Sequence, residues 1–344
     1  MRRALWASLM LVVLPTAALA IPGTPDHIRA ASLLVPYFST GIDSAAHPDD
    51  TLLVVTNEFS ADQIIHVQVW DRDGHAVALS TNILLHGFQT WDSAMRDFIG
   101  TASPTVKGQL TVGDFYTGFV TIDAVSATTS MNPLQSAYPF SDHNYLEGYI
   151  YYTRLAEGSA NGLSMVPLEA VSSGLDAYLR DFYPYGSREE IDADARLCAD
   201  QLAKGISPCT GDSNGVTDRI HFRQFGLTAL NGTTKLVIFT WEPFITGAGP
   251  SVICDQPMSG CASDYPFKVY RPDGTLTIDT TVRLNHVVNT ITLVGFNTSG
   301  WASIWNIPNI GADLQVYGFS FNSANPASGP SQSWDAIFEA YIIP

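Results

Sequence analysis

The chain has few charged residues, and basic ones are especially scarce. Asp, Glu, Lys and Arg make up 15% of the sequence, and 17 Lys and Arg stand against 33 Asp and Glu, so the formal net charge is −16. Affinity for phosphate backbones rests on Lys and Arg, and so acidity of this size excludes nucleic acid as a partner. The hydrophobic content of 46% excludes intrinsic disorder.

The sequence also lacks an apolar run of about 20 residues, which is the length that a transmembrane helix needs. Its N-terminus has instead the parts of a secretory signal peptide: basic Arg2 and Arg3, a short apolar stretch at 4–14, and the small-residue site Ala18-Leu19-Ala20. We predict that residues 1–20 are a signal peptide. The mature protein is then exported to the periplasm, the cell surface or the extracellular space, and no transmembrane segment is expected.

Cysteine is scarce as well, with four residues in total: Cys198, Cys209, Cys254 and Cys261. They form no C-x-x-C pair and have no clustered histidine beside them, which argues against a metal site. An even number in an exported protein indicates disulfide bonds, and four cysteines allow three pairings. The short separations favour Cys198–Cys209 and Cys254–Cys261.

What the sequence does contain is one stretch in two copies, 200 positions apart. The first copy begins at Trp70-Asp71-Arg72-Asp73-Gly74 and the second at Tyr270-Arg271-Pro272-Asp273-Gly274. Each continues without a gap to a Leu-x-His triplet, at His86 and His286, and then to a threonine. A β-rich run enters each Asp-Gly turn and another leaves it, which is typical of a β-hairpin. The repeat therefore predicts two related domains with the same strand order.

We predict an all-β fold of two related antiparallel β-sandwich domains joined by a short helical connector. The N-terminal sandwich covers 21–171, the connector 172–217 and the C-terminal sandwich 218–344. Residues 63–70 alternate between apolar and polar, which indicates a strand with one face on a core and the other in water. An insertion at 243–264, rich in Gly, Pro and Ser, separates two paired strands of the second domain and carries two of the cysteines.

The connector has the clearest helix signals of the chain. Ser187-Arg-Glu-Glu190 is a capping box, and Ile191, Ala195, Cys198 and Leu202 then recur at helical spacing up to Lys204-Gly205. In the first domain, only the stretch from Thr90 to Phe98 indicates a helix.

Two local features are expected within strands. Pro36 restricts the first strand to an edge or a bulge, because proline cannot donate to a sheet. A glycine stands beside an aromatic residue in Tyr116–Val120, Leu146–Ile150 and Val316–Ser320, which indicates a bulge or a close approach of two backbones.

Candidate catalytic residues are weakly supported. No G-x-S-x-G elbow is present, although eight histidines and many aspartates leave a catalytic triad open, because triads are defined by geometry. His86 and His286 have no duplicated partner in the sequence. We expect both to have a structural role, since an imidazole at such a position can hydrogen-bond a neighbouring backbone carbonyl.

Asp212, Asn214 and Asp218 have the spacing of oxygen ligands in some calcium loops. The bidentate Glu of an EF-hand is missing at the twelfth position, and an Asx-rich turn explains the same residues. Calcium is the one cofactor that this pattern leaves open.

Three stretches, Ser32–Phe38, Thr51–Asn57 and His66–Gly74, resemble a group of exported bacterial proteins known mainly as uncharacterised sequences with β-sandwich domains. The resemblance covers the first domain. It implies an exported, β-rich protein and no particular activity, and it supplies no catalytic residues.

The function that we predict is that of an exported, non-catalytic binding or structural component of the cell envelope or surface, with a surface glycan or a protein as partner. One alternative is a secreted hydrolase or glycan-active enzyme. Another is an extracellular filament subunit, a homo-oligomer assembled by strand addition through Trp334–Ile343. We expect this last strand to complete a sheet of its own domain, since an exposed apolar edge promotes aggregation.

Overall fold

A computed structural model of the chain describes residues 29–133, 138–141, 143–154, 159–168, 218–224, 233–241, 263–284, 286–293, 299–307, 315–324, 334–339 and 341–343. These residues are mostly β-strand and form four antiparallel sheets, which confirms the all-β prediction. The expected signal peptide, connector helix and four cysteines, together with Asp212 and Asn214, lie outside the described residues. Asp218 begins a strand.

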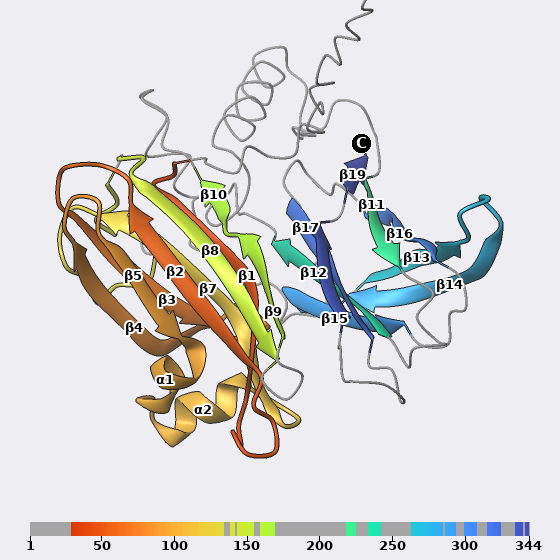
Figure 1. Cartoon of the computed structure of the whole chain (residues 1–344), viewed down its shortest axis with the longest axis horizontal. Helices are drawn as coiled ribbons and strands as arrows, with labels where there is room; N and C mark the ends of the chain where they lie inside the picture. Colours follow the sequence, from red (N-terminus) through yellow and green to blue (C-terminus); the bar gives the residue numbers. More distant parts are fainter. Residues whose placement is uncertain are drawn as a thin grey trace, which may run out of the picture.

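The strands before residue 169, here called the first half, form two sheets (Figure 1). The larger has the order β10-β1-β7-β3-β4, with β6 paired to β7, and the smaller has the order β5-β2-β8-β9. The strands are β1 Ser32–Gly41, β2 Asp50–Asn57, β3 Gln63–Trp70, β4 Ala76–Leu85, β5 Thr90–Ala94, β6 Thr111–Val112, β7 Phe115–Val125, β8 Leu146–Arg154, β9 Ser159–Ser164 and β10 Val166–Leu168.

The strands after residue 217, the second half, also form two sheets. One has the order β14-β13-β16-β11-β19 and the other the order β15-β12-β17-β18. The strands are β11 Asp218–Gln224, β12 Thr233–Trp241, β13 Ser263–Tyr270, β14 Leu276–Leu284, β15 Val288–Leu293, β16 Gly300–Ile307, β17 Gln315–Ala324, β18 Trp334–Glu339 and β19 Tyr341–Ile343.

The strand order of the first half recurs in the second. The order β10-β1-β7-β3-β4 corresponds to β19-β11-β16-β13-β14, and β5-β2-β8-β9 corresponds to β15-β12-β17-β18. The two copies of the repeated stretch form the equivalent hairpins β3–β4 and β13–β14. In both hairpins the aromatic residue before the turn pairs at the same offset, Trp70 with Ala76 and Tyr270 with Leu276. The prediction that both copies have the same strand order is confirmed.

The glycine beside an aromatic residue marks one equivalent position in the two halves. Gly118 and Gly300 precede Phe119 and Trp301, which pair with Trp70 and Tyr270. A side chain at either glycine would collide with the backbone carbonyl of that paired aromatic residue. The close backbone approach expected at Gly118 is therefore confirmed.

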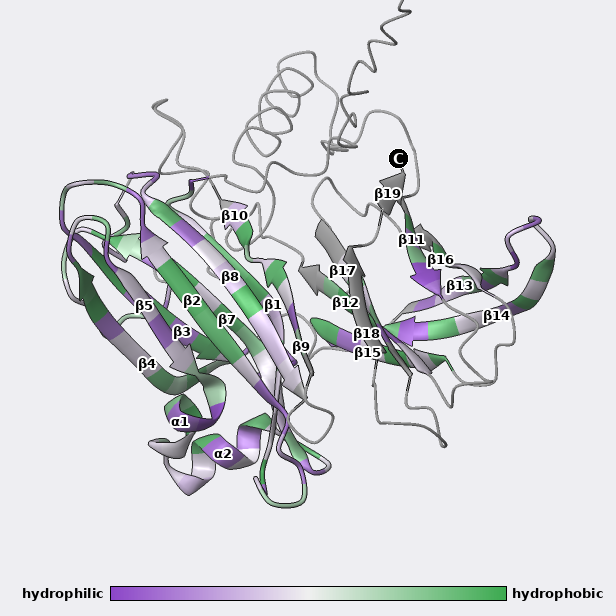
Figure 2. Cartoon of the chain, viewed as in Figure 1, coloured by the Kyte–Doolittle hydropathy of each residue, from purple (hydrophilic) through white to green (hydrophobic). Residues whose placement is uncertain are grey.

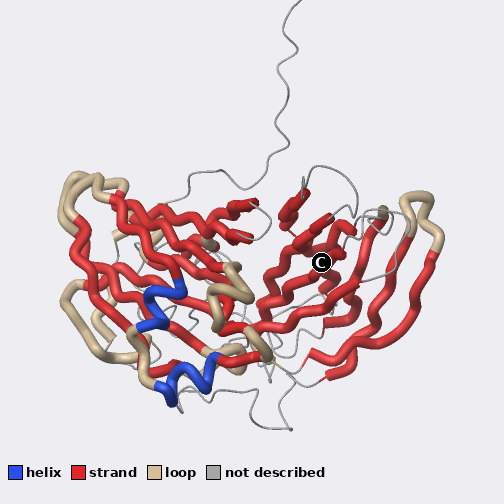
Figure 3. The backbone as a smooth tube through the Cα atoms, turned by 60° about the horizontal axis from the view of Figure 1, so that its bottom comes forward, coloured by secondary structure: helices blue, strands red, loops and turns tan. Residues whose placement is uncertain are grey.

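Two helices and one bulge complete the first half. The register of β1 on β7 shifts between Val35 and Phe38, as Pro36 predicts. The strand expected at 63–70 is present as β3, but its polar face is not in water: His66 is 0% and Gln68 4% exposed. The Tyr138 ring packs 5.7 Å from the His66 ring, and Gln68 donates to the Val77 carbonyl. The expected helix over 90–98 is partly wrong, because β5 occupies Thr90–Ala94 and α1 begins only at Met95, ending at Gly100. A second helix, α2, spans Pro104–Leu110. Figure 3 shows both helices at one end of the first half. Among the described residues, no helix has the length and apolar character to cross a membrane.

The last stretch, expected as one strand, is two. β18 pairs with β17 and β19 pairs with β11, so the chain leaves one sheet after Glu339 and enters the other at Tyr341. β9 and β10 do the same on either side of Met165, pairing with β8 and β1. A single strand was the wrong expectation because the chain closes both sheets of each half in turn. The expectation that this segment completes the sheets of its own chain is confirmed.

The buried apolar residues form two clusters. The smaller lies within the second half and includes Phe222, Leu236 and Ile238. The larger fills the first half, where hydrophobic residues run along β1, β2, β7 and β8 (Figure 2). It also continues into the second half through Val237, Phe239 and other residues of β15, β12 and β17. Since neighbouring residues of a strand point to opposite faces, β12 is buried on both faces.

Candidate functional site

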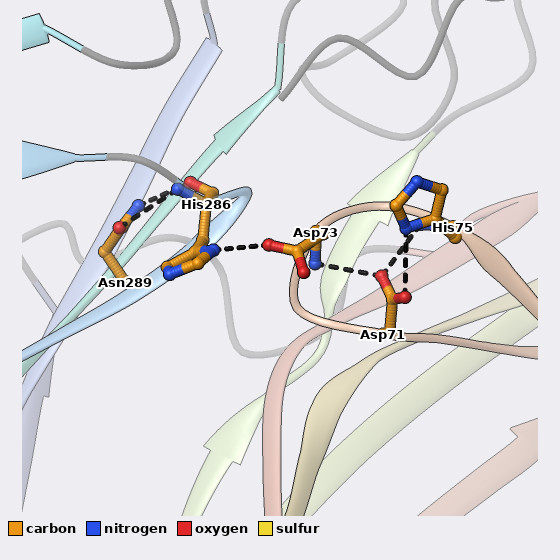
Figure 4. A network of polar contacts seen from close by, with 5 residues as sticks. All are labelled: Asp71, Asp73, His75, His286 and Asn289. Carbon is orange, nitrogen blue, oxygen red and sulfur yellow. Dashed lines mark hydrogen bonds and ion pairs between the residues drawn. The ribbon is translucent and has the colours of Figure 1, made fainter. Parts of the chain in front are cut away.

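The two halves meet where the turn of the β3–β4 hairpin contacts the turn between β14 and β15 (Figure 4). The backbone N–H of Val288 donates to the carbonyl of Arg72 at 3.0 Å. The Nδ1 atom of His286 makes a short hydrogen bond with the carboxylate of Asp73. The backbone N–H of His286 donates in turn to Asn289 Oδ1 at 3.3 Å. One carboxylate and one carbonyl of the first half are thus held by the second.

The sequence of the hairpin turn explains why Asp73 has this position. Asp71 is 7% exposed, and its Oδ1 accepts from the backbone N–H groups of Asp73 and His75, both at 2.9 Å. Its Oδ2 lies 3.0 Å from His75 Nδ1. Gly74 has a φ of 90°, which favours glycine. The buried Asp71 therefore organises the turn and leaves the Asp73 carboxylate directed at His286.

The electrostatics of this contact favour a charged Asp73. The hydrogen bond with His286 lowers the pKa of Asp73, and its partial burial opposes the shift only in part. The contact is an ion pair when His286 is protonated. The side chains of His286 and Asp73 are 22% and 35% exposed, so water screens the pair only in part.

Asp71, Asp73 and His75 also form a group of three metal-ligand types, with ligand atoms within 4.8 Å of one another. The contacts inside the turn account for this group. Asp71 bonds two backbone N–H groups and the His75 ring, and Asp73 bonds His286. We therefore assign it to the folding of the turn and not to a metal ion.

The same pair of contacts occurs at the equivalent turn of the first half, but another segment makes it. His86 Nδ1 lies 3.1 Å from Asp62 Oδ2, and the N–H of Phe88 donates to the carbonyl of Phe59 at 3.0 Å. Asp62 and Phe59 belong to the loop between β2 and β3. The contact that the structure shows for each imidazole is with a carboxylate, and the two carboxylates come from segments that are not equivalent in sequence.

A cleft with a volume of about 580 Å³ lies beside this contact and is lined by both halves. The first half contributes residues of β1, β2, β7, β8 and β9, and the second half contributes residues of β12, β14, β15 and β17. Its charged and aromatic residues are Tyr37, Asp49, Asp50, Arg72, Phe115, Tyr152, Lys235, Arg283, His286 and Phe321. Amides and hydroxyls supply the other polar groups, among them Asn161, Asn289, Thr117 and Thr290.

One wall of the cleft is a fixed aromatic group. The rings of Tyr37 and Tyr152 are stacked with centroids 6.3 Å apart, and Phe321 meets Tyr152 edge to face at 4.7 Å. Tyr152 donates its hydroxyl to the Tyr37 carbonyl at 2.7 Å, and burial raises the pKa of Tyr152 well above 10.0. The Tyr152 hydroxyl is thus a hydrogen-bond donor and not a base.

The cleft places three basic side chains in a strongly acidic protein. Lys235 Nζ donates to the Tyr37 hydroxyl at 2.6 Å and lies 4.7 Å from the centre of that ring. Arg72 and Arg283 line the same space. Burial raises the pKa of Asp50, although hydrogen bonds from Thr40, Thr51 and Arg96 lower it in part. The cleft therefore presents positive charge, hydrogen-bonding groups and aromatic surface together.

The sequence indicates Arg72 only as part of a hairpin turn and His286 only as a structural residue, and it marks no residue of the cleft as a ligand contact. The cysteines and the calcium candidates Asp212 and Asn214 lie outside the described residues, and nothing is described of the Asp218 side chain. The one signal for the cleft is the pair of Lys235 and Arg283 in a chain with few basic residues, but their distance in sequence gives no reason to join them.

Comparison with known proteins assigns no relative. No protein family model matches the chain, and no curated protein matches it in sequence. Among solved structures, a lectin from Pleurotus ostreatus in complex with GalNAc is 10% identical with a TM-score of 0.19, over 92% of this chain and 88% of the lectin. A β-glucuronidase from Parabacteroides merdae is 12% identical with a TM-score of 0.15, over 95% of this chain. The chain spans 32% of that enzyme's length. Likenesses at these TM-scores assign neither a fold nor a function.

Proposed function

We propose that the protein is an exported, non-catalytic binding protein of the bacterial cell envelope or surface, whose ligand enters the cleft between its two halves. In this proposal residues 1–20 are removed on export, and two related β-sandwich domains, 21–171 and 218–344, are joined by the helical connector 172–217. The recurrence of strand order between the halves supports the two related domains. The resemblance to exported bacterial proteins supports the location.

The observation that carries the binding role is the cleft itself. A volume of about 580 Å³ is within the range of sites for small ligands. Its lining of aromatic rings, amides, hydroxyls and basic side chains suits a polar ligand such as a surface glycan, because sugars offer both hydroxyl groups and apolar ring faces. A flat protein partner would not fill such a space.

A secreted hydrolase is the second candidate, and the Asp73–His286 pair favours it, since a carboxylate orients the histidine of a triad. The same carboxylate–histidine pair recurs as Asp62–His86 on an exposed turn. A contact that is repeated on a surface turn is better explained by turn structure than by catalysis. We therefore prefer the binding role.

An array of bacterial surface polysaccharides, neutral and acidic, tests the proposal with the mature protein. We expect at least one polysaccharide to bind, and Lys235→Met and Arg283→Gln to weaken that binding. Lys268→Gln is the matched control, because Lys268 pairs with Asp279 at 3.8 Å and does not line the cleft. An array without any bound polysaccharide, or binding that both cleft variants leave unchanged, would refute the proposal.

A further inference from the structure

We infer that the protein associates head to tail with further copies of itself, through the two surfaces that correspond to the contact between its own halves. Within one chain, an end of the first half packs on the outer face of the sheet β15-β12-β17-β18. At the equivalent end of the second half Leu276 and Trp301 are exposed, and at the equivalent face of the first half Phe88 and Tyr151 are exposed. We call them the end surface, formed by Arg223, Tyr270–Leu276 and Trp301, and the face surface, formed by Leu52, Val54, Tyr149, Tyr151 and the turn at 86–89.

Strand pairing identifies which residues correspond. Phe119 pairs with Trp70 in the first half, and Trp301 pairs with Tyr270 in the second. On the opposing sheet, Val237 pairs with Phe319, and at the same places of the first half Val54 pairs with Tyr149. The residue two positions on, Phe321, likewise corresponds to Tyr151.

The contact within the chain is aromatic and fully buried. Phe119 meets Phe239 edge to face with ring centroids 5.2 Å apart, and Phe319 lies 5.9 Å from Tyr152. Phe119, Phe239 and Phe319 are all 0% exposed. This end of one half and this face of the other thus pack together through buried aromatic rings.

Their counterparts expose apolar side chains to solvent. Trp301 is 37% exposed where Phe119 is buried, and Tyr151 is 37% exposed where Phe321 packs against the core. Phe88, on the turn that carries His86, is 68% exposed. Eight large hydrophobic residues are exposed in the described part of the chain, and five of them belong to these surfaces or border them: Phe59, Phe88, Tyr151, Leu276 and Trp301. Exposed apolar residues that gather in this way mark interaction sites.

Charge also matches the two surfaces. The end surface carries Arg223, whose guanidinium lies 5.5 Å from the centre of the Trp301 ring, and the exposed Arg271. The face surface has Asp92 and Glu147 on its strands and Asp62 beside its turn. Arginine stacked on an aromatic ring is common at protein interfaces.

His86 already contacts the Asp62 carboxylate of its own chain, and docking replaces Asp62 with a carboxylate of the second copy. Asp62 fills the place beside His86 that Asp73 fills beside His286. The side chains of His86 and Asp62 are 67% and 57% exposed, so their contact contributes little. Asp273 of a second copy, on a hairpin turn that Figure 1 places on the side away from the first half, takes the place of Asp62 on docking.

Because the end and face surfaces differ, each copy keeps one of them free after the first contact. Such a heterologous interface continues into chains of subunits and does not stop at a dimer. It differs from strand addition, since β18 and β19 keep their partners within their own chain.

Sedimentation of the mature protein over a range of concentrations tests the inference. We expect the wild type to grow beyond a dimer as the concentration rises. Trp301→Ser removes the end surface and Tyr151→Ser the face surface, so each variant alone stays monomeric. An equimolar mixture of the two forms dimers and nothing larger, because one intact surface of each kind remains.

Ile42→Ser is the matched control, since Ile42 is 43% exposed but lies on neither surface, and we expect it to associate like the wild type. Circular dichroism shows whether each variant is folded. A wild type that stays monomeric up to millimolar concentration overturns the inference. So does association that persists in Trp301→Ser, or a mixture that stays monomeric while the wild type associates.

Discussion

The strands β2 and β12 occupy the same place in the two halves, yet one is buried on a single face and the other on both. β2 alternates between half-buried and buried residues along its whole length. In β12, the four consecutive residues from Leu236 to Phe239 are all 0% exposed. The difference lies in what the outward positions meet: solvent at Val54 and Thr56, and the first half of the chain at Val237 and Phe239. One strand order thus serves both as an outer layer and as a middle layer.

The turns that carry His86 and His286 also differ in which half of the chain contacts them. Each histidine contacts a carboxylate, and the N–H two residues later donates to a carbonyl. The first half closes its turn with its own loop, and the second half uses the hairpin turn of the first. The connection that corresponds to the 58–62 loop is longer in the second half, at 242–262, so the two loops are not interchangeable. The carboxylate–histidine contact that lies within the first half therefore corresponds to a contact between the two halves at His286.

The largest effect is expected for Phe239→Ala. Phe239 is fully buried between the halves, and removing a buried Phe ring costs about 3–5 kcal/mol. Thr56→Ala, at the equivalent position, removes only an exposed hydroxyl that contacts Thr90 at 3.0 Å, and should cost less than about 1 kcal/mol. Urea unfolding of both variants measures the difference. Equal losses would mean that the two faces are covered alike.

A matched pair of valines sharpens this result. Val237→Ala removes two methyl groups from a fully buried site, and we expect a loss of about 2 kcal/mol in the free energy of unfolding. Val54→Ala makes the same chemical change on a half-buried face, and we expect a loss below about 1 kcal/mol. Thermal unfolding monitored by near-ultraviolet circular dichroism provides both values. A larger loss at Val54 would reverse the comparison.

The two histidines should differ by less. His286→Ala removes a partly buried hydrogen bond to Asp73, and we expect a loss of about 1 kcal/mol. His86→Ala removes an exposed contact with Asp62, so its loss should lie within about 0.5 kcal/mol of zero. Hydrogen exchange at the Val288 amide, which donates to Arg72, should speed up only in His286→Ala. Faster exchange there in His86→Ala would contradict the separate roles.

The smallest expected effect is a dependence of the free energy of unfolding on pH in the acid range. The pKa of Asp73 is lowered in the folded protein below 3.8, chiefly by the hydrogen bond with His286. A lowered folded pKa means that the stabilisation is present above the unfolded pKa and is lost as the pH falls through the folded pKa. The stability difference between wild type and Asp73→Asn should therefore shrink below about pH 4. Asp62→Asn is the control, and a difference that stays constant with pH would refute the linkage.

Much of the fold of each half could be predicted from local chemistry. Two Asp-Gly turns between β-rich runs identify the hairpins, and Pro36 identifies the bulge. The helix α2 was missed although its start carries two signals: Ser103 accepts a hydrogen bond from the N–H of Val106, and Pro104 stands in the first turn. Gly108 lowers the helix propensity of this short segment, so the sequence did not indicate a helix there.

The candidate site could not be predicted in the same way. The stretches Thr51–Thr56 and Lys235–Thr240 are about equally apolar, so nothing in either tells which of them is covered on its second face. The cleft joins residues from Tyr37 to Asn322, and only the packing of one half on the other brings them together. The histidine partners Asp62 and Asp73 lie at unrelated positions, so a search for duplicated partners fails.

The larger apolar cluster crosses from one half into the other, which has a consequence for how the chain melts and how it can be divided. A calorimeter should record one cooperative transition, because the first half cannot lose its packing without exposing Phe239 and Phe319. A protease cut between residues 169 and 217 should leave two fragments that stay together and copurify. Expressed as separate genes, the same two fragments should form a complementation pair, because the larger cluster needs residues of both.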